Sequence, residues 1–272
     1  MDLTTIRVEI SGRVATVWLD RPHRHNAWTG RLHTELRSVM FDLEQNQAIR
    51  AVVITGTGTA FCVGGDSEAL AQHAERGSYD PGLAADAAKP GMRMQPEFDD
   101  DMAWMYAYRT PIIAAVNGAA AGIGLAFALF CDLRFGAAGA KLTTAAPKLG
   151  LPAEYGTSWV LPRLIGVTRA ADLLLSGRTV TVADTADWGL WNDVLPDGEQ
   201  ALAAALEYAR TLTTTTGAEA VSVAKSQLYR DLIRPDVGAS VAESRQLIDE
   251  AMRTDDYREG IAAFIERRPP NF

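Results

Sequence analysis

The stretch from Ile112 to Cys131, IIAAVNGAAAGIGLAFALFC, restricts the possible folds most, because it contains no charged residue. Its length and hydrophobicity resemble those of a membrane-spanning helix. However, Asn117 and Gly118 interrupt it, and much of it is Ala and Gly rather than Leu or Ile. A turn dipeptide between two apolar segments favours a buried strand, a tight turn and a buried helix. We therefore expect the core of a soluble protein without a membrane partner.

Strand-like and helix-like patterns alternate along the first two-thirds of the chain. Apolar spacing in Thr29 to about Gln45 predicts an amphipathic helix, and a short helix is expected from Asp66 onward. From Ser158 the pattern is mostly helical. These patterns predict an α/β fold of repeated strand–strand–helix units followed by a helical layer. Further strands are predicted at 6–10, 14–19, 51–55, 112–117 and 133–138, an extended piece near residue 142, and helices at 99–108 and 122–130.

A Gly-, Pro- and Asp-rich insertion separates two of these units, roughly from Arg76 to Pro96. It has no strong periodicity, so we interpret it as a flexible loop. Loops of this length often form a lid or a wall of a substrate site.

Charge and cysteine content exclude several classes of function. The formal net charge of −8 argues against general nucleic-acid binding, which needs a basic face. The two cysteines, Cys62 and Cys131, form no CxxC motif, so a reducing compartment is expected. The start of the chain has no apolar core of signal-peptide length. We expect a cytoplasmic protein.

Several familiar motifs are absent. GIGLAF follows a strand and opens a helix, but Phe127 stands where a dinucleotide fingerprint needs its third glycine. There is no GxxxxGK[ST], HExxH or GxSxG sequence. No cluster of Cys, His and acidic residues has metal-ligand spacing. We therefore predict neither a metal nor a separate cofactor.

Two glycine-rich turns remain, AFCVGGD (60–66) and AAAGIG (119–124), each after a buried strand and before a helix. Such turns leave backbone N–H groups unpaired at a helix N-terminus, where partial positive charge collects. Two of them directed at one point would form an oxyanion hole. Taken singly, each turn is better explained by tight turning and close packing.

Together with other segments, these turns resemble the crotonase, or enoyl-CoA hydratase/isomerase, family. The resemblance runs from LDRPHRHNA to the C-terminus and includes KLGLPAEYGTSWVLPRLIG and REGIAAFIERRPPNF. It implies a crotonase-like spiral of ββα units at residues 1–197 and a C-terminal helical oligomerisation domain at 198–272. It also implies acyl-CoA thioester substrates and a homotrimer or dimer of trimers.

The resemblance assigns roles to individual residues. The oxyanion-hole donors are matched by the backbone N–H groups of Gly65 and Ile123. Many relatives have Gly at the position of Ile123. Asp66 is expected to cap the following helix. The residues matched to substrate or CoA contacts are His23, Arg24, Cys62 and Arg267, and the neighbouring Arg268 is also basic. Surface solvation explains the arginines equally well, and His23 stands where relatives often have Lys.

The chain departs from the family hydratases at their two catalytic glutamates, which are matched here by Ala126 and Ala146. Glu154, in GLPAEYG, matches the catalytic acid of Δ3,Δ2-enoyl-CoA isomerases and of some other isomerases in the family. One carboxylate is sufficient to move a double bond, whereas hydration divides its proton transfers between two. Without the resemblance, Glu154 would be interpreted as a surface turn residue or a helix cap.

The sequence thus predicts an enzyme in which Glu154 is the base for double-bond isomerisation. One alternative is an enoyl-CoA hydratase that uses Glu154 and a second acid from the 76–96 insertion or nearby, such as Glu68. Another is a catalytically silent acyl-CoA-binding protein.

Overall fold

A computed structural model describes residues 2–91 and 96–272, and its strands form two sheets. The strands are β1 (Ile6–Ser11), β2 (Val14–Leu19), β3 (Ala51–Gly56), β4 (Ala60–Cys62), β5 (Ile112–Val116), β6 (Ala119–Ala121), β7 (Leu133–Ala137), β8 (Lys141–Thr143), β9 (Val180–Thr181) and β10 (Asp193–Leu195). The larger sheet has the order β1-β2-β3-β5-β7-β10, with antiparallel pairing only between β1 and β2. The smaller has the order β4-β6-β8-β9, antiparallel only between β8 and β9.

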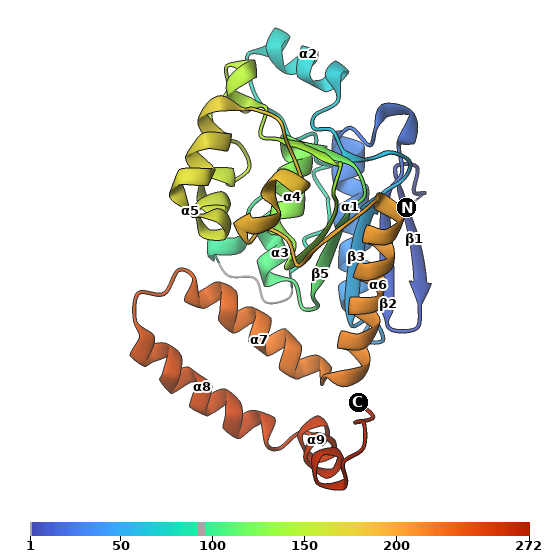
Figure 1. Ribbon diagram of the computed structural model, residues 1–272, viewed down its shortest axis with the longest axis vertical. Coiled ribbons are helices and arrows are strands. Elements are labelled where there is room, and N and C mark those ends of the chain that lie inside the picture. The colour runs from blue at the N-terminus through green and yellow to red at the C-terminus, as the bar shows by residue number, and fades with distance from the viewer. Residues whose placement is uncertain (1, 92–95) are drawn as a thin grey trace.

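The helices follow the strands in a repeating order (Figure 1). The α-helices are α1 (Gly30–Gln45), α2 (Ser67–Arg76), α3 (Trp104–Ala107), α4 (Ile123–Phe130), α5 (Thr157–Ser176), α6 (Gly198–Thr215), α7 (Ala218–Asp231), α8 (Val237–Ala251) and α9 (Asp255–Glu266). Short 3-10 helices are η1 (Pro22–Arg24), η2 (Pro96–Phe98), η3 (Ala146–Leu149) and η4 (Ala183–Trp188).

The predicted strand–strand–helix repeat is present. In β3-β4-α2, β5-β6-α4 and β7-β8-α5, the first strand enters the large sheet and the second enters the small sheet, before a helix follows. Of the second strands, β8 was predicted as an extended piece near residue 142. Strands β4 and β6 were not predicted as separate elements, because each has only three residues and β6 lies inside one of the glycine-rich turns. Each repeat therefore advances both sheets by one strand.

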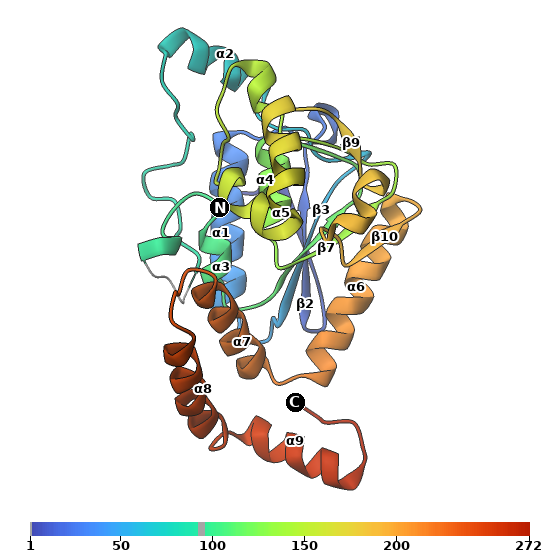
Figure 2. The same ribbon diagram turned by 60° about the vertical axis from the view of Figure 1, so that its left-hand side comes forward.

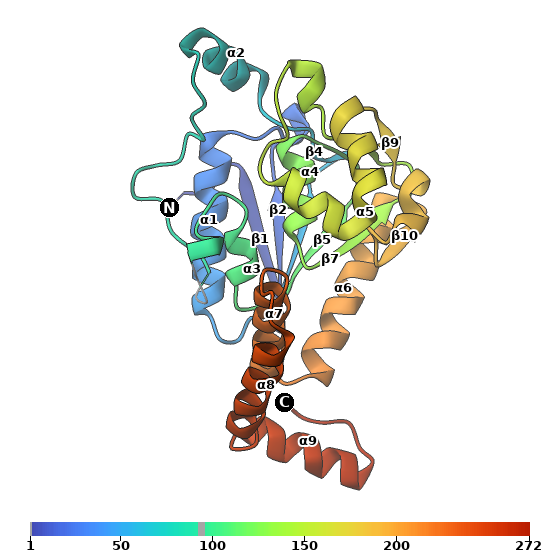
Figure 3. The ribbon, with the colours of Figure 1, turned by 90° about the vertical axis from the view of Figure 1, so that its left-hand side faces the viewer.

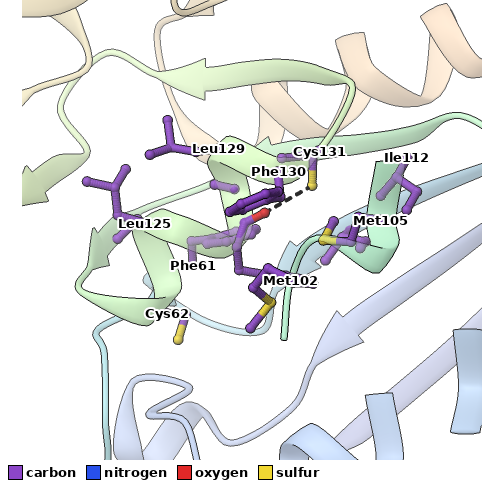
Figure 4. Close-up of a cluster of buried hydrophobic side chains, with 14 of the residues drawn as sticks. Phe61, Cys62, Met102, Met105, Ile112, Leu125, Leu129, Phe130 and Cys131 are labelled. Atoms are coloured by element: carbon purple, nitrogen blue, oxygen red, sulfur yellow. Dashed lines mark hydrogen bonds between the residues drawn. The ribbon is translucent and has the colours of Figure 1, made fainter. Parts of the chain in front are cut away.

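Helices cover both faces of the large sheet. Helix α6 lies on one side of the strands, and α1 and α4 lie on the other (Figure 2). On the α6 side, Ala205 and Ala209 pack against Val53 and Ile113, so small residues allow the helix to approach the sheet closely. On the other side, a larger apolar cluster includes Phe61, Met102 and Phe130 (Figure 4).

The long apolar stretch forms β5, β6 and α4 as separate elements. Every residue of β5 and α4 is buried, which explains the absence of charge there. Asn117 makes the turn between the strands by donating from Nδ2 to the carbonyls of Gly56 (2.9 Å) and Gly58 (3.0 Å). Among residues 2–91 and 96–272, no helix has both the length and the hydropathy needed to cross a bilayer.

The predicted insertion lies along α1. The Ala84 N–H donates to Thr34 Oγ1 (3.2 Å), Arg37 Nε donates to the Ala88 carbonyl (3.1 Å), and the Gly91 N–H donates to a Glu44 carboxylate oxygen (2.6 Å). We call residues 82–91 the strap, since hydrogen bonds tie it to successive turns of α1. Residues 92–95 of the predicted insertion lie outside the described residues.

One prediction of secondary structure was wrong in part. The helix predicted at 99–108 is limited to α3, because the residues before it form turns. The region after Ser158 is mostly helical, as predicted, but it also contains β10, which extends the large sheet by pairing in parallel with β7. Such pairing depends on distant residues and is not visible in a local pattern.

The last three helices extend from the end of the molecule opposite α2 (Figures 1 and 3). Helix α7 is joined to the core by Lys225, whose Nζ lies 2.7 Å from Asp132 and donates to the Thr110 carbonyl at 3.1 Å. Tyr229 donates to the same Asp132 carboxylate at 2.7 Å. The division predicted at residues 197 and 198 stays a prediction.

Candidate active site

The small sheet brings the two glycine-rich turns together. Strands β4 and β6 pair in parallel, so the turns that follow them leave the sheet at the same edge. The contact is close: a Cβ on Gly124 would lie 2.2 Å from the Cys62 carbonyl oxygen. Gly64 has φ +101°, a conformation that only glycine adopts readily. Both glycines are therefore required by the local geometry.

Each turn presents one unpaired backbone donor. The N–H of Trp28 donates to the Gly64 carbonyl (2.7 Å) and that of Asp66 to the Trp28 carbonyl (2.9 Å), which holds the chain on both sides of Gly65. The N–H of Gly65 itself has no partner within the described part of the chain. Ile123 is the first residue of α4, so its N–H is also free of intrahelical bonding.

Gly65 and Ile123 both line one cavity of about 900 Å³. The cavity lies between the start of α1, helix α2 and its following loop, the start of α4, and the segment before α5. Its apolar wall residues are Trp28, Ala69, Leu70, Ala74, Pro81, Ile123, Leu149, Leu151 and Pro152. Its polar wall includes His73, Arg76, Tyr79, Asp80, Asp101, Glu154 and Tyr155.

Glu154 enters the same cavity from the segment between η3 and α5. Its backbone carbonyl accepts from the N–H (2.9 Å) and the hydroxyl (2.8 Å) of Thr157, which fixes the turn into α5. Its carboxylate has no hydrogen bond or ion pair with a described residue, and α5 has no side-chain cap. The side chain is half-buried, and burial raises the pKa of its carboxyl group. Glu154 is thus neither a helix cap nor a freely solvated turn residue.

Two tyrosines stand beside Glu154. Tyr79, from the loop after α2, packs edge-to-face on Tyr155 with ring centroids 6.1 Å apart. Tyr155 follows Glu154 directly, at φ 51°. Tyr79 and Asp101 were not predicted as site residues, because they come from segments distant from Glu154 in the sequence. Tyr155 adjoins Glu154 in GLPAEYG but was not predicted as a site residue either.

The positions of the missing hydratase glutamates are filled by buried alanines. Ala126 is 0% exposed and Ala146 is 3% exposed, and both are packed into the core. Glu68, the suggested second acid, has an 81% exposed side chain near Arg24 and does not line the cavity. The structure therefore does not place it with Glu154.

Asp66 is a structural residue, as expected. Its carboxylate accepts from the Glu68 N–H and caps α2. It also pairs with Arg21 at 3.1 Å and with Arg24 at 2.8 Å. Burial opposes ionisation, but these hydrogen bonds outweigh it and lower the pKa of Asp66.

None of the four residues matched to CoA contacts lines the cavity. His23 is exposed in η1, and the guanidinium of Arg24 is engaged with Asp66. Cys62 is 0% exposed, and burial raises the pKa of its thiol to about 12, so a direct contact between its side chain and substrate is not available. Arg267 is exposed at the end of α9, in the part of the chain farthest from α2 (Figure 3).

In residues 2–91 and 96–272, no group of His, Cys, Asp and Glu side chains could hold a metal ion.

Known proteins resemble this chain over its whole length. Residues 9–272 match the sequence profile of the family described as "Enoyl-CoA hydratase/isomerase". A "Probable enoyl-CoA hydratase" of Rhodobacter capsulatus is 31% identical, over 100% of this chain and 99% of its own. A "1,2-epoxyphenylacetyl-CoA isomerase" of Escherichia coli is 32% identical, over 95% and 94%.

A solved structure agrees with these sequence matches. The crystal structure of a probable enoyl-CoA hydratase/isomerase from Mycobacterium abscessus superimposes with a TM-score of 0.85 and 31% identity, covering 99% of each chain. The match confirms the predicted crotonase-like α/β fold. With its ββα spiral, its paired glycine turns and a match over nearly every residue, the chain belongs to the enoyl-CoA hydratase/isomerase family, whose members act on acyl-CoA thioesters.

Proposed function

We propose that this protein isomerises an enoyl-CoA thioester by moving its double bond from the Δ3 to the Δ2 position, with Glu154 as the base. The observation that carries the proposal is that Glu154 lines one cavity with Gly65 and Ile123, whose N–H groups donate no hydrogen bond within the described helices and turns. These are the groups that a proton transfer beside a thioester carbonyl requires.

The reaction needs one carboxylate that is used twice. Glu154 removes a proton from the carbon next to the carbonyl, and the electron pair delocalises onto the thioester oxygen. The Gly65 and Ile123 N–H groups stabilise the negative charge of this dienolate. Glu154 then returns the proton two carbons further along the chain, so the double bond becomes conjugated with the carbonyl. No proton is gained or lost overall, and no cofactor is needed because CoA arrives with the substrate.

The environment of Glu154 supports this role. A carboxylate without protein hydrogen bonds in a partly apolar cavity is a stronger base than one in water, as its raised pKa indicates. The proton must also remain on the carboxyl group between removal and return. Exclusion of water by a bound acyl chain would favour this retention.

Hydration is the second candidate, because several relatives are named as probable enoyl-CoA hydratases. It requires a second proton-transfer group, since Ala126 and Ala146 cannot supply one. A silent acyl-CoA-binding protein is the third. Incubation with 3-enoyl-CoA and with 2-enoyl-CoA, followed by absorbance of the conjugated thioester, separates all three. Isomerisation increases absorbance with the first substrate, hydration decreases it with the second, and a binding protein changes neither.

Substitution of the base gives the second test. Glu154→Gln keeps the size of the side chain but cannot accept the proton, so turnover should disappear while acyl-CoA binding persists. Glu68→Gln is the matched control, because Glu68 is an exposed glutamate outside the cavity. Activity that survived in Glu154→Gln would overturn the assignment of the base.

We also propose assembly into a homotrimer or a dimer of trimers through α7–α9. These helices, together with the residues that cap their C-termini, expose many large apolar side chains, which is typical of an interaction surface. They are Leu228, Leu232, Val237, Val241, Ile248, Met252, Tyr257, Ile261, Phe264 and Ile265. Within such an assembly, Arg267 would reach CoA bound to a neighbouring subunit. His23 and Arg24 would contact CoA at the entrance to the cavity of their own subunit. Light scattering of the full chain tests the mass, and a monomer would refute this proposal.

A further inference from the structure

A second carboxylate, Asp101, lines the same cavity as Glu154. It lies in the turns before α3, where it follows Asp99 and Asp100. Those two residues are exposed and do not line the cavity, whereas Asp101 is partly buried. No described residue forms a hydrogen bond or ion pair with the Asp101 carboxylate. Asp101 is thus a cavity-wall acid whose burial is not compensated by a described partner.

Burial of the Asp101 carboxyl group without a described hydrogen-bond partner disfavours its ionised form. The pKa of Asp101 is raised by burial and by the charge of Asp100, although the nearby Arg37 opposes this. A buried polar group without a hydrogen bond is unfavourable, and a ligand that supplies the missing bond gains affinity. The ligand group that complements the Asp101 carboxylate is a hydrogen-bond donor.

The tyrosine pair lines the cavity together with this acid and the proposed base. Burial raises the pKa of Tyr79, and the charges of both Asp101 and Glu154 raise it further. The pKa of Glu154 is raised by burial. Tyr79 and Tyr155 thus stand near both acids on the wall of one cavity.

The part of the substrate near Asp101 follows from charge. CoA carries several phosphate charges, which a carboxylate would repel, so the CoA end does not lie against Asp101. Glu154 must face the carbons close to the thioester. The acyl chain beyond these carbons is the part of the substrate left to pass the tyrosines and reach Asp101.

We propose that Asp101 selects acyl-CoA thioesters whose acyl group carries a hydrogen-bond donor, such as a hydroxyl group, at a position remote from the thioester. This inference rests on the proposed function, in that the cavity holds the acyl group of an acyl-CoA. It assigns Asp101 to substrate specificity and leaves the proton transfer to Glu154. The Tyr79 and Tyr155 rings form the wall along which the intervening carbons pack.

Binding of saturated thioesters tests the inference without any turnover. The probes are acyl-CoA compounds of increasing chain length, each paired with its analogue that carries a hydroxyl group on the terminal carbon. Calorimetry on the full chain should show, for the chain length that reaches Asp101, about 10-fold tighter binding of the hydroxylated analogue, as a hydrogen bond to a charged group provides.

Variants identify the residue responsible. Asp101→Leu should abolish the preference or reverse it, and Asp101→Asn, which keeps the shape but not the charge, should reduce it. Asp99→Asn is the matched control and should bind like the wild type, because Asp99 is exposed outside the cavity. Equal binding of every pair by the wild type, or a preference that persists in Asp101→Leu, would overturn the inference.

These measurements distinguish failure of the role of Asp101 from failure of the proposed function. If the wild type binds these thioesters but isomerises no enoyl-CoA, the proposed reaction fails while the preference can still be read from binding. If it isomerises 3-enoyl-CoA and binds every pair equally, the reaction stands and the role of Asp101 fails. If no acyl-CoA binds at all, both are refuted.

Discussion

A Cβ atom on Gly124 would lie 2.2 Å from the carbonyl oxygen of Cys62, so the first turn of α4 and the end of β4 are in direct backbone contact. This contact holds the Gly65 and Ile123 N–H groups in a fixed relationship, because each lies close along the chain to one of the contacting residues. The proposed oxyanion hole is therefore formed by packing between two ββα units. It is not a property of either turn alone.

Gly124→Ala should separate the two turns and reduce activity. Loss of one donor of an oxyanion hole lowers kcat by about 100-fold to 1,000-fold, and a decrease of that order is expected. The steady-state rate with 3-enoyl-CoA measures it. Gly139→Ala is the control, since a Cβ at that position would meet no atom within 4 Å and its φ is not positive. Full activity in Gly124→Ala would show that the hole does not depend on this contact.

The activity should show an acid limb set by Glu154. The base must be ionised, so kcat/KM should rise as the pH passes through its pKa. Because burial raises this pKa, the midpoint should lie above the ordinary value of 4.5. A pH profile of kcat/KM checks this expectation. A midpoint at or below 4.5 would mean that the base is solvated or is another group.

Glu154→Gln should stabilise the protein at neutral pH. Since the folded pKa exceeds the unfolded pKa, ionisation of Glu154 weakens folding as the pH rises through the folded value. The neutral amide avoids this penalty, so the free energy of unfolding of Glu154→Gln should exceed that of the wild type at pH 7. The difference should vanish below the unfolded pKa of about 4.5, where Glu154 is protonated in both the folded and the unfolded state. Urea unfolding at several pH values measures it. Glu68→Gln should show little change, and a loss of stability at pH 7 in Glu154→Gln would contradict the argument.

Lys225→Met should destabilise the protein by about 3 kcal/mol, because removal of one member of a buried ion pair leaves the other charge unpaired. The Lys225 and Asp132 side chains are 6% and 13% exposed, and Tyr229 binds the same carboxylate. Urea denaturation gives the free energy of unfolding. Arg258→Ala removes the exposed pair with Asp255 and should change it by less than about 1 kcal/mol. Similar effects of both substitutions would disprove the importance of the buried pair.

Gly30→Ala should displace the strap from α1. A Cβ there would lie 2.2 Å from the Gly82 carbonyl oxygen, and both glycines line the cavity. We expect faster proteolysis within residues 77–91 and a higher KM for the acyl-CoA, with a smaller effect on kcat, because Glu154 and the oxyanion donors lie on other segments. Gly139→Ala is again the control. Unchanged proteolysis and KM would show that the strap does not shape the substrate site.

The sequence by itself determined most elements of the fold and the residues proposed for chemistry. Apolar periodicity is local, so the helix α1 and the strands β1, β2, β3 and β5 were predicted to within a few residues. Glycine turns and an isolated glutamate are also local signals. They were sufficient to single out Gly65, Ile123 and Glu154 once the family resemblance had aligned them.

Only the tertiary structure decided what surrounds these residues. The strap runs along α1 because of hydrogen bonds between segments about fifty residues apart, such as that of Arg37 with Ala88. The same long-range packing places Tyr79 on Tyr155 and brings Asp101 to the cavity. It also buries Cys62 and pairs Arg24 with Asp66, and no local pattern in the sequence indicates either contact. Contacts between distant segments depend on how whole elements pack, and no local pattern of residues encodes them.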